Sequence, residues 1–253
     1  MTKEITFLWI AGWSISHSIW DTYMKAWPNV HHLTVDFGQC QHIKEIEEYV
    51  EKALTPRDHS SIIVIGWSLG SMVALQKAIP CASRIQGMFL IGSTAQFVKS
   101  KENPYGCDPR QIVWLKRKIK KNPIKGLADF DQQMFSQSEV EAGEWRRWCE
   151  TARLAIPSVS SLLIGLDYLQ QFQIDPKSLS AMQFPIFLLS GAEDNICPPS
   201  GAKWLTDHLS RAKLTIWEET GHLPFWTQPQ RFLTWMKEGL ADVYDENKNS
   251  KAV

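Results

Sequence analysis

The stretch Ile62–Leu75, with the sequence IIVIGWSLGSMVAL, decides the fold. It opens with β-branched residues, which are typical of a buried strand, and it ends in a helical pattern. Between the two lies GWSLG (66–70), a G-x-S-x-G pattern that marks a sharp strand-to-helix turn. The turn forces the serine into a strained backbone conformation, so the residues two positions before and after it must be small. The pattern therefore predicts that Ser68 is exposed at the carboxyl edge of a sheet.

Short apolar runs like the one before Ser68 recur along the chain, with helical patterns between them. Continuous apolar runs, rather than alternating ones, favour strands that are buried on both faces. The segment Ile43–Leu54 has apolar residues at helical spacing, and similar patterns follow Ser68, Pro199 and Pro229. This alternation predicts an α/β fold with a mostly parallel sheet flanked by helices. The expected strands are 5–10, 32–36, 61–65, 87–91, 185–190 and 214–218.

One segment of the chain lacks this alternation of strands and helices. Residues 97–165 show no convincing strand, only helical patterns such as Glu139–Ala155. We interpret this segment as a helical cap inserted into an α/β core formed by residues 1–96 and 166–241. The polar residues 242–253 are expected to form a flexible C-terminal tail.

The composition limits the classes of function. Lys and Arg number 27, and so do Asp and Glu, so no overall charge favours nucleic acid or a membrane. The five cysteines are scattered without metal-binding spacing, which indicates reduced thiols. No run approaches the roughly 18 apolar residues of a spanning helix, and the N-terminus lacks a cleavable signal pattern. We therefore expect a soluble, cytoplasmic protein without a metal site.

A serine hydroxyl needs a base to become nucleophilic, and the base needs an acid to orient it. On this type of fold the chain order is Ser, then Asp or Glu, then His. Asp194 lies in a loop after the expected strand 185–190 and is the candidate acid, with the neighbouring Glu193 as the alternative. His222 lies in a glycine-containing loop after the last expected strand and is the candidate base. The sequence thus predicts a triad of Ser68, Asp194 and His222.

Such a triad also needs two backbone N–H groups that stabilise the oxyanion. Leu69 directly follows the serine and supplies one of them. The second is expected from the loop after the first strand, at residues 11–14, where Trp13 is the best candidate. The Trp13 side chain is also placed to form a wall of an acyl pocket, and His17 is a candidate to line its mouth.

Several motifs together carry a resemblance to a known family: Gly12-Trp13, Trp20, Gly66-Trp67-Ser68-Leu69-Gly70, Gly191 to Asp194, His222 and Pro224-Phe225. From Ile5 to about Leu240 the chain resembles the α/β hydrolases. Within them it resembles the pimeloyl-acyl-carrier-protein methyl ester carboxylesterases of biotin synthesis. The resemblance implies that Ser68, with His222 and Asp194, hydrolyses the methyl ester of an acyl chain without any cofactor.

The resemblance extends to the cap with less detail. The stretch 129–134 is similar to the pocket-lining helix of the family, which implies that Phe130, Gln133 and Met134 contact the acyl chain. No departure from the family pattern removes a catalytic group. The departures are Ala11 in place of a histidine, a loop at 35–39 without Asp-x-Pro-Gly-x-Gly, and Ser71 in place of a glycine.

The charge of the cap indicates a possible partner. Between Pro109 and Ala128 there are seven basic residues and no acidic one. Because the resemblance implies a substrate carried on an acidic acyl carrier protein, a basic rim would steer that protein to the pocket. A solvated helix face is the simpler alternative, and we expect a monomer. The candidate docking residues are Lys116, Arg117, Lys120, Lys121 and Lys125.

Two other functions remain open at this point. A lyase of the menaquinone pathway also uses an elbow serine and a basic cap, and the fold does not separate it from an esterase. A weakly catalytic ligand receptor could keep the triad for sensing. Dehalogenases and epoxide hydrolases are disfavoured, because they carry an aspartate at the position of Ser68.

Overall fold

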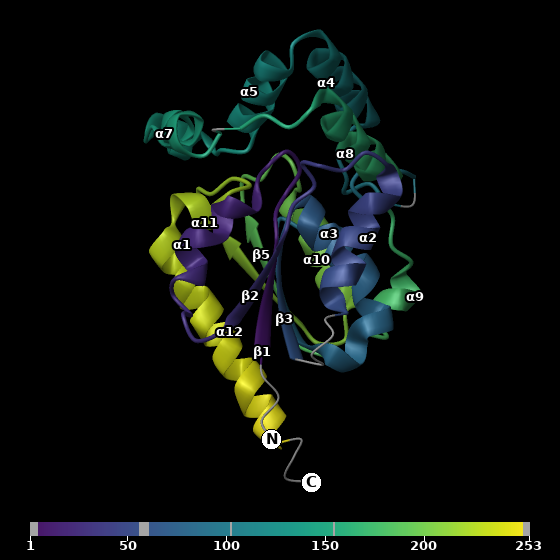
Figure 1. The fold of residues 1–253 in the computed structure, drawn as a ribbon, viewed down its shortest axis with the longest axis vertical. Helices are drawn as coiled ribbons and strands as arrows, with labels where there is room; N and C mark the ends of the chain where they lie inside the picture. The colour runs from purple at the N-terminus through teal and green to yellow at the C-terminus, as the bar shows by residue number, and fades with distance from the viewer. Residues whose placement is uncertain (1–4, 56–60, 102, 154, 250–253) are drawn as a thin grey trace.

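In the computed structural model, a parallel six-stranded sheet has helices on both faces and a group of helices above its carboxyl edge (Figure 1). The structure describes residues 5–55, 61–101, 103–153 and 155–249. The strand order is β2-β1-β3-β4-β5-β6, and every neighbouring pair is parallel. This arrangement confirms the predicted α/β fold. The strands are β1 (Ile5–Ile10), β2 (His31–Val35), β3 (Ser61–Trp67), β4 (Ile85–Ile91), β5 (Ile186–Gly191) and β6 (Ala212–Trp217).

Strand β3 lies inside the sheet, and all seven of its residues are buried. Ile65 is flanked by Trp9 of β1 and Phe89 of β4. A strand covered on both faces and both edges needs a continuous apolar run, which is what this segment has. The ladder with β4 continues to Trp67, two residues beyond the predicted end of the strand, so the turn begins directly at Ser68.

Helices cover both faces of the sheet: α1, α11 and α12 lie on one side, and α2 and α3 lie on the other (Figure 1). The ring centroid of Trp20 lies 4.7 Å from that of Phe225 in α11 and 5.5 Å from that of Trp9 in β1. This aromatic contact ties α11, which follows His222, to the sheet. The core helices are α1 (Asp21–Met24), α2 (Ile43–Leu54), α3 (Leu69–Ala78), α9 (Pro176–Leu179), α10 (Pro199–His208), α11 (Pro224–Thr227) and α12 (Pro229–Asn249), with 3-10 turns at His17–Trp20 and Ile79–Arg84.

The cap stands above the carboxyl edge of the sheet (Figure 1). The prediction of one helix over Glu139–Ala155 is wrong, because Gly143 adopts a left-handed φ of 84° that separates two helices. The predicted cap boundary at residue 165 falls within the last cap helix. The cap helices are α4 (Pro109–Lys121), α5 (Pro123–Gln133), α6 (Gln137–Glu141), α7 (Glu144–Thr151) and α8 (Val159–Gln171).

The C-terminal helix is longer than the sequence predicts. Residues 242–249, expected to belong to a flexible tail, continue α12 to Asn249, and residues 250–253 lie outside the described part. Val243 explains the difference, because it is fully buried and packs against Gly87 of β4. Burial of one such side chain stabilises the fold by about 1.5–3 kcal/mol, which holds this turn of the helix on the sheet.

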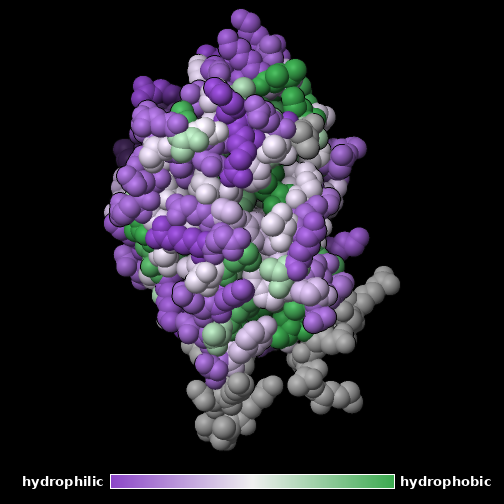
Figure 2. Space-filling model, turned by 90° about the vertical axis from the view of Figure 1, so that its left-hand side faces the viewer, coloured by the Kyte–Doolittle hydropathy of each residue, from purple (hydrophilic) through white to green (hydrophobic). Residues whose placement is uncertain are grey.

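The face shown in Figure 2 is mostly hydrophilic, and its hydrophobic residues form several separate patches. Separate apolar residues of this kind are normal on a surface that faces water. Within the described residues, no helix combines the length and the apolar character that crossing a membrane requires.

Candidate active site

Ser68 occupies the strained turn that the sequence predicts. Its backbone has φ 54° and ψ −121°, outside the conformations that side-chain-bearing residues normally adopt. A Cβ on Gly66 would lie 2.8 Å from Ser71 Cα, and a Cβ on Gly70 would lie 2.5 Å from the carbonyl oxygen of Ala11. Both glycines are therefore required by close backbone contacts. The Ser71 hydroxyl adds to the turn by donating to the Ser68 carbonyl oxygen at 2.6 Å.

Asp194 and His222 meet at the carboxyl edge of the sheet. Asp194 Oδ2 lies 2.7 Å from His222 Nδ1, and both side chains are about 1% exposed. A carboxylate oxygen accepts, so the hydrogen of this bond lies on His222 Nδ1, and Nε2 is the ring nitrogen that does not contact Asp194. Asp194 Oδ1 accepts from the amides of Ile196 and Cys197, at 2.9 and 2.8 Å, which fixes the carboxylate.

The structure separates Asp194 from the alternative acid. Glu193 is exposed, and its carboxylate accepts a weak hydrogen bond of 3.4 Å from the amide of Gln137 in the cap. Among the described residues, the histidine pairs with Asp194 and forms no hydrogen bond with Glu193. The geometry thus favours Asp194 as the partner of the histidine.

Two contacts bring Ser68 beside this pair. The amide of Ser68 donates to the carbonyl oxygen of Ile91, and the next residue, Gly92, lies against the His222 ring. A Cβ on Gly92 would stand 2.6 Å from His222 Cε1. His222 Nε2 is buried and has no hydrogen-bond partner among the described residues. Trp67 also holds the histidine, because its Nε1 donates to the His222 carbonyl oxygen at 3.0 Å.

Cys197 is a neighbour of the serine that sequence patterns do not reveal. Its side chain is buried and lies close to the Ser68 side chain. Burial, followed by the negative charge of Asp194, raises the pKa of the Cys197 thiol well above its usual range. The thiol is therefore protonated and uncharged beside the candidate nucleophile.

The loop after β1 approaches the turn from the other side. Ser14 has a left-handed φ of 64°, and Trp13 Nε1 donates to the Leu162 carbonyl oxygen of α8 at 2.9 Å. A Cβ on Gly165 would lie 2.4 Å from Trp13 Cδ1, so α8 must pass close to the indole. Among the described residues, neither the Trp13 amide nor the Leu69 amide has a hydrogen-bond partner. Both amides are thus free to stabilise an oxyanion.

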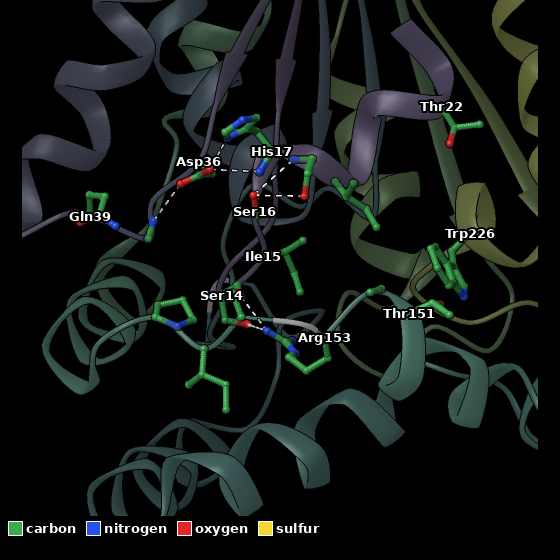
Figure 3. A pocket seen from close by; sticks show the side chains of 17 residues that line it. Ser14, Ile15, Ser16, His17, Thr22, Asp36, Gln39, Thr151, Arg153 and Trp226 are labelled. Atoms are coloured by element: carbon green, nitrogen blue, oxygen red, sulfur yellow. Dashed lines mark hydrogen bonds and ion pairs between the residues drawn. The ribbon is translucent and has the colours of Figure 1, made fainter. Parts of the chain in front are cut away.

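The cap holds this loop with a buried ion pair that sequence patterns do not indicate. Arg153 Nη2 lies 2.5 Å from Asp131 Oδ1. Arg153 Nη1 also donates to the Ser14 carbonyl oxygen at 2.6 Å, as Figure 3 shows. The Asp131 side chain has no exposed surface, and its Oδ2 also accepts from Trp148 Nε1 at 2.9 Å. Each partner lies in a different helix or loop, so only the fold brings them together.

An apolar cavity of about 270 Å³ lies between the cap and the core. Phe130 and Gln133, predicted from the resemblance as acyl contacts, are among its lining residues, and so is Trp13. Met134 is not among them; it is buried, and its carbonyl oxygen accepts from the His222 amide. The other lining residues are Phe97, Cys107, Gln111, Ile112, Trp114, Leu115, Leu166, Leu169, Asn195 and Ile196.

A second and larger hollow, of about 660 Å³, is lined by Ser14 and the residues that follow it (Figure 3). His17 and Asp36 border it, and their side chains meet with His17 Nδ1 2.6 Å from Asp36 Oδ2. The structure thus places His17 in this hollow and not among the residues that line the apolar cavity.

The seven basic residues between Pro109 and Ala128 fall into two groups. Lys116 is bonded to Asp167 of α8 at 2.6 Å, Lys118 is bonded to Asp129 and lies over the Trp114 ring, and Arg110 is paired with Asp108. The second group is exposed and has no ion-pair partner among the described residues. Its members are Arg117, Lys120, Lys121 and Lys125.

The chain is similar in sequence to curated esterases. Two curated relatives are both named pimeloyl-[acyl-carrier protein] methyl ester esterase. The relative from Nitrosomonas europaea is 27% identical over 232 residues, which cover 88% of this chain and 90% of the relative. The relative from Shewanella sp. is 28% identical over 243 residues, which cover 92% and 90%.

Solved structures share the fold at lower identity. An esterase from Exiguobacterium antarcticum has a TM-score of 0.76 at 16% identity, covering 96% of this chain and 93% of its own. A bromoperoxidase from Bacillus anthracis has a TM-score of 0.77 at 17% identity, covering 95% and 92%. The family model described as serine aminopeptidase, S33 (Hydrolase_4) matches residues 36–226. With more than half of its length matched, the chain belongs to this family of α/β hydrolases.

Proposed function

We propose that the chain is a serine carboxylesterase in which Ser68 is the nucleophile, His222 the base and Asp194 the acid. The observation that carries this proposal is the buried pair of His222 and Asp194 beside the strained turn at Ser68. In this pair His222 Nε2 has no hydrogen-bond partner among the described residues. Such a nitrogen can take the proton of a serine hydroxyl, which needs a base to become a nucleophile. The esterase names of the curated relatives support the same reaction.

The reaction follows from these positions. His222 Nε2 takes the proton of Ser68 as the oxygen attacks the ester carbonyl, and the amides of Leu69 and Trp13 stabilise the resulting oxyanion. His222 returns the proton to the leaving alcohol, and an acyl group remains on Ser68. Water, activated by the same histidine, then attacks the acyl-enzyme and releases the carboxylic acid and the free serine. Asp194 stabilises the positive charge on the ring in both steps.

For the substrate we propose an acyl methyl ester presented by an acidic acyl carrier protein, specifically the pimeloyl ester named in the relatives. The lining of the apolar cavity supports this reading, because it runs from Trp13 and Ile196 beside the site to Trp114 in α4. Trp114 is 49% exposed, and Ile124 is 67% exposed. An acyl chain in this cavity would have one end beside Trp13 and Ile196 and the other at the surface of α4.

The charge around that outer end supports the same partner. Arg117, Lys120, Lys121 and Lys125 have no internal ion pair in the described structure, so their charges are free for an acidic surface. Lys116 is engaged with Asp167, and we leave it out of the proposed docking surface. Attraction of this kind increases the association rate and is weakened by salt.

The esterase reaction is tested by turnover of p-nitrophenyl butyrate. Wild type should hydrolyse the ester repeatedly, and Ser68→Ala should lower kcat by at least about 10⁴-fold, as expected for loss of a triad nucleophile. Repeated turnover in the Ser68→Ala variant would contradict the proposal. A single burst without turnover in wild type would favour a ligand receptor instead.

The substrate is tested in a biotin auxotroph that lacks its own pimeloyl methyl esterase. The wild-type gene should restore growth without biotin, and a gene encoding Ser68→Ala, expressed to the same level, should not. Failure of the well-expressed wild type to restore growth would refute the biotin substrate. It would leave the esterase reaction standing if p-nitrophenyl butyrate is turned over.

A further inference from the structure

Glu139 of the cap is hydrogen-bonded to the loop that carries the candidate base. Its Oε2 accepts from the amide of Gly221 at 3.0 Å and from the amide of Ser136 at 2.8 Å. Its Oε1 accepts from the hydroxyl of Thr227 at 2.7 Å. The residue is only 7% exposed, and a buried carboxylate is costly unless such donors surround it. Three donors from the cap, the histidine loop and α11 therefore converge on one side chain.

The loop itself has a strained backbone that needs external support. Glu219 has a left-handed φ of 53°, which is unfavourable for a residue with a side chain. The hydroxyls of Ser136 and Ser138 both donate to the Glu219 carbonyl oxygen, at 2.9 and 3.2 Å. The amide of His222 donates to the Met134 carbonyl oxygen at 2.6 Å. The cap thus contacts the loop at several successive backbone groups.

The cap and the loop are also in close backbone contact at Gly221. A Cβ there would lie 2.3 Å from the Met134 carbonyl oxygen and 2.8 Å from the Ser136 amide nitrogen. The loop therefore has no free space toward the cap, and a displacement of either segment displaces the other.

We infer that Glu139 is a positioning residue for His222. Its carboxylate accepts hydrogen bonds from the Gly221 amide and from the Thr227 hydroxyl of α11. These bonds fix the position of the histidine loop, and so the direction in which His222 Nε2 points. The inference rests on the proposed function, because it requires His222 to be the base of Ser68. A base must lie within about 2.6–3.2 Å of the proton that it removes, and a displacement of about 1 Å can cost about 100-fold in rate.

The inference also defines a part of the cap that is not a removable lid. Residues 134–139 support the histidine loop directly, whereas α4 and the end of α5, at Phe130 and Gln133, line the acyl cavity. A cap motion that keeps the base in place must therefore leave residues 134–139 where they are.

Three substitutions separate acceptor geometry from charge. In Glu139→Gln the amide oxygen can still accept from the amides of Gly221 and Ser136. The NH₂ group donates to the Thr227 hydroxyl, and that hydroxyl then donates to the Leu223 carbonyl oxygen in place of Glu139. Its kcat should stay within about threefold of wild type. Glu139→Asp has the charge but a shorter reach, and Glu139→Leu has neither charge nor acceptor. Both should lower kcat by about 100-fold.

The readout must exclude a simple loss of folded protein. The kcat for p-nitrophenyl butyrate is referred to the number of serines that a fluorophosphonate labels at completion, and circular dichroism confirms that each variant is folded. KM should change by no more than about threefold, because the substrate pocket is untouched. Glu141→Ala is the matched control, since Glu141 lies in the same helix, is exposed and forms a side-chain hydrogen bond only with Gln137 among the described groups. Its kcat should equal that of wild type.

The outcomes distinguish this inference from the proposed function. Wild-type kcat in both Glu139→Asp and Glu139→Leu, with an inactive Ser68→Ala, would overturn the positioning role alone. A loss of kcat in Glu139→Gln as large as that in Glu139→Leu would also overturn it. If Glu139→Leu does not fold, Glu139→Asp decides. Full turnover in Ser68→Ala would overturn the proposed function and this inference with it.

Discussion

The core and the cap of this hydrolase are built by different interactions. The inner strands β1, β3, β4 and β5 are mostly apolar and buried, and β3 is buried over its whole length. The base of the cap is joined to the core by polar contacts: Arg153 to the Ser14 loop, and Glu139 to the Gly221 loop. Apolar packing tolerates small shifts better than hydrogen bonds, whose strength depends steeply on angle. The sheet therefore supplies most of the stability, and the cap sets the positions of two loops beside Ser68.

The largest effect is expected in the core, at Asp194. We expect Asp194→Asn to lower kcat by about 10⁴-fold, because the amide no longer fixes the ring of His222 with Nε2 as a free base. Steady-state hydrolysis of p-nitrophenyl butyrate measures this. Glu193→Gln is the matched control and should be as active as wild type. The reverse ranking of the two variants would make Glu193 the acid and contradict the geometry.

The next effect concerns the attachment of the cap. Asp131→Ala leaves Arg153 buried without its partner, which should lower the free energy of unfolding by about 3–5 kcal/mol. Asp242→Ala is the control, because Asp242 pairs with Lys213 at the surface, where their side chains are 46% and 71% exposed. It should cost at most about 1 kcal/mol. Urea denaturation measures both, and equal losses would show that the buried pair does not anchor the cap.

A smaller and more selective effect is expected at the outer cap. Arg117→Glu combined with Lys121→Glu should reduce kcat/KM for a carrier-bound acyl ester by about 10-fold or more at low salt, because rim charges act on association. The value for a free short ester should not change. Lys52→Glu combined with Lys237→Glu reverses two exposed charges on the surface of the α/β core. It should change kcat/KM for neither substrate. Equal losses on both substrates in the cap variant would exclude docking.

The effect that is smallest at neutral pH is expected at the thiols. Burial raises the pKa of Cys107, at the junction of core and cap, to about 12. A thiol with a raised folded-state pKa contributes stability that is present below its unfolded pKa of about 8.5 and is lost as the pH rises through the folded value. The free energy of unfolding should therefore fall between about pH 9 and 12, and less steeply in Cys107→Ala than in wild type. Cys149→Ala, at an exposed site, is the control, and equal slopes in all three proteins would contradict the assignment.

The difference between core and cap also explains how far the sequence could predict the molecule. The inner strands and Ser68 follow from local patterns, because burial on both faces requires a continuous apolar run and the turn requires glycines two residues away. Asp194 and His222 could be placed from chain order alone, since both follow parallel strands that end at one edge. Their meeting at 2.7 Å is a fact of the structure.

The polar attachments of the cap could not be predicted in this way. Asp131 and Arg153 are separated by 22 residues, and Glu139 and Gly221 by 82. No helical or strand period relates such pairs, and a buried carboxylate looks like an exposed one in a sequence. Met134 shows the same limit: the family resemblance implies a substrate contact for its side chain, yet its backbone oxygen is what contacts the histidine.

The claim that Ser68 is the nucleophile is tested most directly by the mass of the protein after reaction with a fluorophosphonate. We expect one adduct per chain, located on the peptide that contains Ser68. We also expect no adduct in Ser68→Ala and markedly slower labelling in His222→Ala. An adduct on a different residue, or unchanged labelling of the Ser68→Ala variant, would contradict the assignment of Ser68 as the nucleophile.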